Sequence, residues 1–249
     1  MKKFAVFLVA ICVAFTATLA NALTIDVVDV TGAKYGYLPL SLFGVAPVAG
    51  FGDEDILNYG VFPFEYAAET WDTVGVVSNG YLVVGGGDLG DVTYINQSFP
   101  DTMSPNNVLA PFWTDLNPEA GGAFRIAYLT DGVDTWLVTD WEAVPNWDDG
   151  EPNSFQAWIG VNGVEDIWFT YGNISDGDGG SLTIGAEDKT GTVGFNYYFN
   201  GTGALPTDGT ELAVVTSGAP VPVSEPATIL LFGAGLIGLA VFSRKLRKR

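Results

Sequence analysis

The chain has 249 residues, of which 29 are acidic and 10 are basic; it contains no histidine and a single cysteine, Cys12. Without histidine it cannot build a Ser-His-Asp triad or an imidazole-ligated zinc site, and one cysteine cannot form an intrachain disulfide. Every acidic residue except Glu225 lies between Leu23 and Val223, where only three basic residues occur. The resulting excess of negative charge repels phosphate backbones and argues against nucleic acid as a partner.

Residues 1–22 have the pattern of a secretory signal peptide. Two lysines precede the apolar run Phe4–Leu19, and Ala20 and Ala22 place small residues at the two positions that signal peptidase recognises. An uncleaved membrane anchor is the alternative, but the apolar run is short for one. We therefore expect signal peptidase to cleave before Leu23 and to release an exported chain without cysteine.

Residues 23–217 predict an all-β extracytoplasmic domain. Short β-branched and apolar runs alternate with turn residues, and no run shows a helical period over about eleven residues. Strands at this spacing, about 8–12 residues, are typical of an antiparallel β-sandwich. The expected strands are 23–30, 73–77, 81–84, 123–130, 135–144, 154–161, 164–171, 181–186, 193–199 and 211–216.

Two Asn-Gly pairs predict tight turns between strands. Asn79-Gly80 separates two of the expected strands, and Asn162-Gly163 separates two others. Both residue types accept a positive φ, as the tight two-residue hairpin turn requires. We expect both positions of each pair to have that backbone conformation.

The seven tryptophans could fill the core or stack on sugar rings. Trp158 and Trp168 fall inside expected strands, which favours packing. Trp147 lies in the polar loop 145–151, where we expect exposure. Packing is the preferred interpretation for most of the seven.

Several segments together resemble the NIDO-like β-sandwich of nidogen-type extracellular proteins and many bacterial surface proteins. They are 62–64, 77–82, 107–115, 138–145, 155–156, 167–171 and 183–187, within a span of about 59–216. The most specific part is Ser78-Asn79-Gly80 followed by Ala110-Pro-Phe-Trp-Thr-Asp115. The resemblance implies adhesion or display and brings no catalytic residues.

Acidic loops offer the remaining chemistry. Asp176 and Asp178 alternate with glycine in 176–180, an arrangement that can curl oxygen ligands around calcium. The spacing is not that of an EF-hand, and a solvated turn is the preferred interpretation. Similar acidic loops occur at 53–55 and 148–151.

Catalysis by paired carboxylates is not expected. The acidic residues of Trp141-Glu142 and Glu165-Asp166 lie in or beside expected strands, where adjacent side chains point to opposite faces. No glycosidase-like pair is therefore evident. We expect a non-enzymatic protein with no catalytic residues and no required cofactor, calcium being the one candidate ion.

The C-terminal end has three parts. Residues 218–226 form a proline-rich spacer, 227–243 are uncharged and long enough for a short transmembrane helix, and 244–249 carry five positive charges. By the positive-inside rule the basic tail stays in the cytoplasm and the β-domain lies outside it.

This end resembles the PEP-CTERM sorting signal of Gram-negative bacteria, in which a motif ending in Glu-Pro precedes an apolar helix and a basic tail. Here the motif residues are Ser224, Glu225 and Pro226, with serine in place of the usual proline. The resemblance implies processing by exosortase and display on the surface or in the matrix of bacteria that make exopolysaccharide.

The first hypothesis is an exported, non-enzymatic surface or matrix protein, anchored in the inner membrane until its sorting signal is processed. The alternative is a calcium-dependent module that binds polysaccharide or mediates adhesion. That alternative requires an exposed aromatic platform beside an acidic loop.

Overall fold

The computed structural model describes residues 22–30 and 35–218, which belong to one compact unit, Ala22–Pro220. The predicted signal peptide up to residue 21, the sorting residues Ser224, Glu225 and Pro226, the apolar segment 227–243 and the basic tail lie outside the described residues. Within the described part, no helix is long and apolar enough to cross a membrane.

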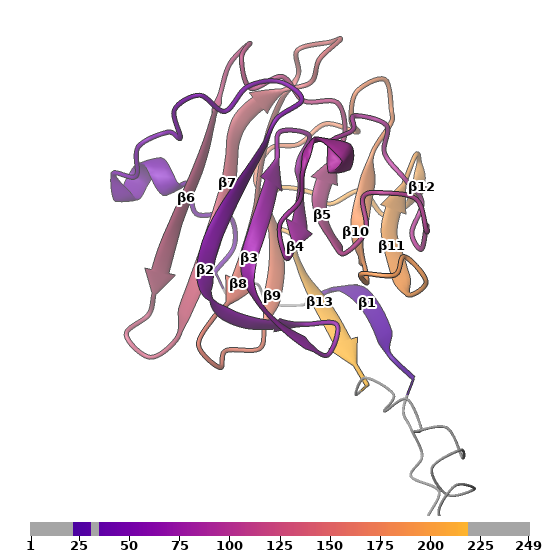
Figure 1. Cartoon of the computed structure of the whole chain (residues 1–249). Coiled ribbons are helices and arrows are strands. Elements are labelled where there is room, and N and C mark those ends of the chain that lie inside the picture. The colour runs from indigo at the N-terminus through magenta and orange to yellow at the C-terminus, as the bar shows by residue number, and fades with distance from the viewer. Residues whose placement is uncertain (1–21, 31–34, 219–249) are drawn as a thin grey trace, which may run out of the picture. The chain divides into compact units, whose positions relative to one another are not determined.

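Among the described residues, thirteen strands form two antiparallel sheets, so the predicted all-β sandwich is confirmed (Figure 1). The seven-stranded sheet, ordered β12-β11-β10-β5-β4-β3-β2, contains β2 (Ile56–Tyr66), β3 (Glu69–Val77), β4 (Tyr81–Val84), β5 (Val108–Trp113), β10 (Thr183–Glu187), β11 (Gly194–Phe199) and β12 (Thr202–Gly203). The six-stranded sheet, ordered β1-β13-β9-β8-β7-β6, contains β1 (Thr24–Asp29), β6 (Ala123–Thr130), β7 (Thr135–Pro145), β8 (Pro152–Gly160), β9 (Ile167–Tyr171) and β13 (Glu211–Ser217). Two short 3₁₀ helices, η1 (Leu40–Phe43) and η2 (Leu89–Asp91), lie in connections.

Aromatic side chains join the two sheets in the core. Phe112 of β5 packs on Phe155 of β8, with ring centroids 5.0 Å apart, and Phe155 stacks on Trp141 of β7 at the same separation. The Tyr171 hydroxyl donates to the Pro111 carbonyl across the sandwich at 2.8 Å. Each large apolar side chain buried in this way contributes about 1.5–3 kcal/mol.

β2 and β5 are not among the expected strands, and each contains a proline. β2 is an edge strand, and its register shifts between Gly60 and Phe64, around Pro63. In β5, Pro111 lies beyond the residues paired with β4 and opposite a register shift in β10. Edges and bulges are where a strand tolerates a residue without an N–H.

The two Asn-Gly turns differ from each other. Asn162 and Gly163 both have positive φ, at 58° and 93°, as predicted. At the other turn only Gly80 does, at 79°, so the prediction is wrong for Asn79. Asn79 is fully buried, and its side chain bonds to two loops, which keeps it out of the tight-turn conformation.

Packing accounts for most of the tryptophans. Four are buried, whereas Trp71 and Trp168 are half-buried and Trp147 is 51% exposed; the buried four are Trp113, Trp136, Trp141 and Trp158. The prediction is confirmed for Trp158 and Trp147, and Trp168 is less buried than expected.

Candidate functional site

Loops at one end of the sandwich form an acidic groove of about 510 Å³. In the seven-stranded sheet the antiparallel order places the starts of β2 and β10 at the same end as the finish of β5. The loop after β7 joins them from the other sheet through the bridge between Leu116 and Asn146. The lining residues are Asp53, Glu54, Tyr94, Ile95, Asn96, Asp115, Trp147, Asp148, Asp178 and Ser181.

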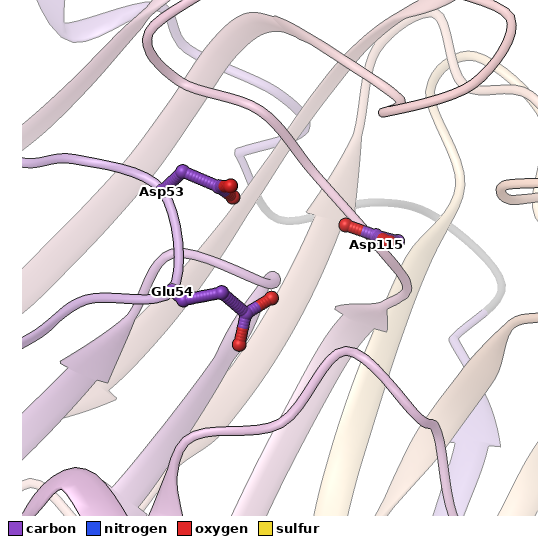
Figure 2. Close-up of side chains that lie close together, drawn as sticks. All are labelled: Asp53, Glu54 and Asp115. Carbon is purple, nitrogen blue, oxygen red and sulfur yellow. The ribbon is translucent and has the colours of Figure 1, made fainter.

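Three carboxylates converge in this groove. Oxygen atoms of Asp53, Glu54 and Asp115 all lie within 4.8 Å of one another. Figure 2 shows Asp53 and Glu54 on one loop, with their carboxylates directed toward Asp115 on the facing loop. The backbone of Glu54 is left-handed, with φ at 48°, where the loop bends before β2.

The turn between β3 and β4 supports one side of the groove. Asn79 Nδ2 donates to Glu54 Oε1 at 3.0 Å, and the Leu116 amide donates to Asn79 Oδ1 at 3.1 Å. One buried side chain thus ties the loop before β2 to the loop after β5. Gly80 is required beside it, because a Cβ at that position would lie 2.0 Å from the Phe112 carbonyl oxygen.

Hydrogen bonds also hold the other side. The Asp178 amide donates to Thr114 Oγ1 at 2.8 Å, and the Asp148 amide donates to Asp178 Oδ1 at 2.9 Å. The Trp147 amide donates to the Asp115 carbonyl at 3.0 Å. The acidic loops after β5 and β7 and before β10 are therefore fixed to one another.

Negative charge is crowded in the groove. Burial, the largest cause, together with repulsion from Asp178, Glu54, Asp53 and Asp148, raises the pKa of Asp115 to about 6. Burial also raises the pKa of Asp53 and of Asp178. Within the described part of the chain, no lysine or arginine lines the groove.

Asp53 has an oxygen that is suited to a cation. Its Oδ1 atom is buried and has no hydrogen-bond partner among the described residues. Carboxylate oxygens of this kind are the ligands that calcium prefers. The cluster of Asp53, Glu54 and Asp115 therefore fits a hard divalent cation.

Two exposed aromatic side chains flank the acidic residues. Trp147 and Tyr94 are each 51% exposed and line the groove. The loop that carries Tyr94 is anchored at Thr93, whose carbonyl accepts from Trp113 Nε1 at 3.0 Å and whose amide donates to the Tyr81 hydroxyl at 3.0 Å.

The structure separates the two residues of the predicted calcium loop. Asp178 lines the groove, whereas Asp176 is exposed and is not among the lining residues. Asp115, which sequence reasoning did not single out as a ligand, lies in the groove instead. Its signal in the sequence is its position at the end of the Ala110–Asp115 segment quoted for the NIDO resemblance.

The predicted cleavage site lies at the beginning of β1. Ala22 is exposed and Leu23 is half-buried, immediately before Thr24 pairs with Ser217 of β13. Ala20 lies outside the described residues, and cleavage before Leu23 stays a prediction.

Two of the carboxylates considered for a glycosidase, Glu142 and Asp166, are hydrogen-bonded to other residues. Glu142 Oε2 accepts from Arg125 Nε at 2.7 Å, and its Oε1 accepts from the Ser41 hydroxyl at 2.6 Å. The Asp166 carboxylate accepts from Trp136 Nε1 at 2.7 Å.

Comparison with known proteins gives two matches along the chain. The family model described as NIDO related matches residues 44–224, and the model of the PEP-CTERM protein-sorting motif matches residues 222–247. No curated protein and no solved structure matches the chain. The first match covers the groove, and the second covers the predicted sorting residues Ser224, Glu225 and Pro226.

Proposed function

This chain belongs to the NIDO-related family and carries a PEP-CTERM sorting motif, which marks an exported surface protein that passes through the membrane; from this we propose a more specific role. It is a non-enzymatic component of the cell surface or extracellular matrix, linked to exopolysaccharide or biofilm. Signal peptidase removes its leader, and its C-terminal segment holds it in the inner membrane until exosortase processes it.

The position of the sorting motif carries this proposal. The motif match begins at residue 222, shortly after β13 ends at Ser217, so the sandwich is complete before the sorting segment starts. The ends of the sandwich are adjacent, because a Cβ on Gly218 would lie 2.6 Å from the Ala22 carbonyl oxygen. Processing at either end therefore leaves the paired strands of the folded unit intact.

Two observations support a non-enzymatic role. The chain contains no histidine to act as a general base. Glu142 and Asp166, which are acidic residues of the two pairs considered for a glycosidase, accept hydrogen bonds from Arg125 and Ser41 and from Trp136.

The intact mass of the protein tests the proposal. In host cells with exosortase, the surface or matrix fraction should contain a form lacking the mass of the apolar segment and basic tail. In a host without exosortase, the longer form should accumulate in the inner membrane. Equal masses in the two hosts would refute exosortase processing.

A second candidate function is calcium-dependent binding of polysaccharide or an adhesion partner. The exposed Trp147 beside the Asp53–Glu54–Asp115 cluster is the combination that this function requires. In this case calcium would bridge the carboxylates and sugar hydroxyls. A neutral polysaccharide should then bind in millimolar calcium and dissociate in chelator, and binding unaffected by chelator would contradict it.

A further inference from the structure

We propose that the groove binds a polysaccharide whose amino sugars are unacetylated, so that the ammonium groups of the ligand itself meet the carboxylates. The inference rests on the proposed surface role and names the class of polymer that the protein would hold there. It differs from the calcium alternative because the positive charge comes with the sugar.

The first argument is the pairing of a groove with exposed rings. Its volume of about 510 Å³ lies in the range of small-ligand sites, roughly 300–1,000 Å³. Trp147 and Tyr94 line it with half of each side chain in contact with solvent, although the fold buries four other tryptophans. Exposed flat rings of this kind can stack on the apolar face of a pyranose.

The second argument is charge. Five acidic side chains line the groove: Asp53, Glu54, Asp115, Asp148 and Asp178. Within the described residues, no basic side chain lines it. The carboxylates of Asp53 and Glu54 are directed across the groove toward Asp115 (Figure 2). A neutral sugar would leave this repulsion in place, whereas an ammonium group relieves it and can also bind over the Trp147 ring.

The third argument favours a sugar over a cationic peptide. None of the lining residues belongs to a strand of either sheet, so the groove offers no sheet edge on which an extended peptide could pair. The Asn96 amide, which could otherwise bond to a peptide, donates to Thr183 Oγ1 and Asn200 Oδ1. The groups that remain to recognise a ligand are the two exposed rings and the five carboxylates, and these suit a pyranose that carries an amine.

Isothermal titration with the full chain in detergent and chelator tests the proposal. The two ligands are a glucosamine hexamer and its fully N-acetylated counterpart, which has the same sugar backbone without the charge. The glucosamine hexamer should bind at least tenfold more tightly. This comparison needs no variant, so it does not depend on a mutant that folds.

Matched variants locate the binding. Trp147→Ala and Asp115→Asn should each weaken binding of the glucosamine hexamer tenfold or more. Asp176→Asn removes one exposed charge outside the groove, and Phe43→Ala removes an exposed ring on η1; both should bind as the unmutated protein does. Equal effects of Asp115→Asn and Asp176→Asn would overturn the proposal, since only overall charge would matter.

Three other results would overturn it. One is equal affinity for both hexamers, another is no binding of either, and the third is equal affinity for a lysine hexamer, which would make this a peptide site. Binding of the acetylated hexamer only when calcium is present would favour the calcium alternative. None of these results affects exosortase processing, which is measured by mass. Failure of the binding proposal is therefore distinguishable from failure of the proposed surface role.

Discussion

The Trp147 amide donates a hydrogen bond of 3.0 Å to the carbonyl of Asp115. Asp115 follows β5 in one sheet and Trp147 follows β7 in the other, so this bond joins the two sheets at the end of the sandwich. It places an exposed ring beside a carboxylate whose pKa is raised to about 6 by burial and by repulsion from neighbouring carboxylates. This backbone contact acts together with the side-chain hydrogen bonds of Asn79, Thr114 and Asp178 to position the loops of the groove.

The sorting assignment predicts the effect of changing Glu225-Pro226 to Ala-Ala. Insertion should be normal, because the apolar segment and positive tail that determine it are unchanged. Processing should fail, since the extended segment imposed by proline and the charge of glutamate are lost. The uncleaved form should accumulate in the inner membrane, as measured by fractionation and intact mass.

A deletion serves as the control for that variant. Removing residues 227–249 should release a soluble, folded β-domain into the periplasm. Normal processed mass and surface delivery of the Ala-Ala variant would show that the segment is a plain membrane anchor.

Replacement of Ala22 by phenylalanine should block removal of the leader, because signal peptidase requires a small residue at that position. The exported protein should then be heavier by residues 1–22, as measured by intact mass. The same replacement at Leu23, on the other side of the bond, should be cleaved normally. A mature N-terminus at Leu23 in the Ala22→Phe variant would show that the site is assigned wrongly.

If the carboxylate cluster binds calcium, the ion should raise the melting temperature, and chelator should reverse the rise. Mass action stabilises the native state by about 2.7 kcal/mol when calcium is at 100 times its Kd. Asp115→Asn should remove the effect, and the double variant Asp176→Asn, Asp178→Asn should weaken it through Asp178, which lines the groove.

Asp176→Asn alone is the matched control for the calcium prediction, because Asp176 is exposed and does not line the groove. It should keep the full thermal shift. No shift in the unmutated protein would leave the cluster as an acidic groove without calcium.

Asn79→Ala should destabilise the sandwich by about 1–3 kcal/mol, because it leaves the buried Leu116 amide without its acceptor and frees Glu54. Denaturant unfolding measures this loss. Asn58→Ala, which removes two solvent-exposed hydrogen bonds to Gly87, should cost less than about 1 kcal/mol. Equal losses in the two variants would contradict the role assigned to Asn79.

Glu187 predicts a pH dependence of stability. Its side chain is fully buried, its Oε2 accepts from the Asp101 amide at 2.9 Å, and its Oε1 has no partner among the described residues. Burial, the largest cause, and repulsion from Asp101 and Asp188 together raise its pKa to about 8, against the lowering effect of the Asp101 amide. Because the folded-state pKa exceeds the usual value near 4.5, the fold favours the protonated form.

Its contribution to stability is therefore fully present below about pH 4.5 and is lost as the pH rises through about 8. Glu187→Gln keeps an acceptor for the Asp101 amide and removes the charge. The change in the free energy of unfolding caused by this substitution should be more favourable at pH 9 than at pH 4, by at least about 1 kcal/mol. Urea titration at the two pH values measures it. The same difference at both pH values would show that Glu187 does not titrate in this range.

The sequence alone determined the strands whose pattern is local. Residues 123–130 were expected as a strand and form β6 with the same bounds, because alternation of side chains between two faces is a property of neighbouring residues. The sorting segment is also a linear pattern, and its match at residues 222–247 agrees with the sequence prediction. β2 and β5 were not predicted. Whether a strand can contain Pro63 or Pro111 depends on edges and bulges that only the assembled sheet defines.

The groove was decided by the tertiary structure. The sequence indicated Asp178 from its own loop, but it could not place Asp53 beside Asp115, which lies 62 positions along the chain. These residues meet because β2 begins and β5 ends at the same end of one sheet. The strand order of that sheet determines this arrangement. Asp176, only two residues from Asp178, stays outside the groove, and Gly177 between them has a positive φ of 92°. Charge could be counted from the sequence, but its concentration at one place required the long-range pairing of strands, which no local pattern encodes.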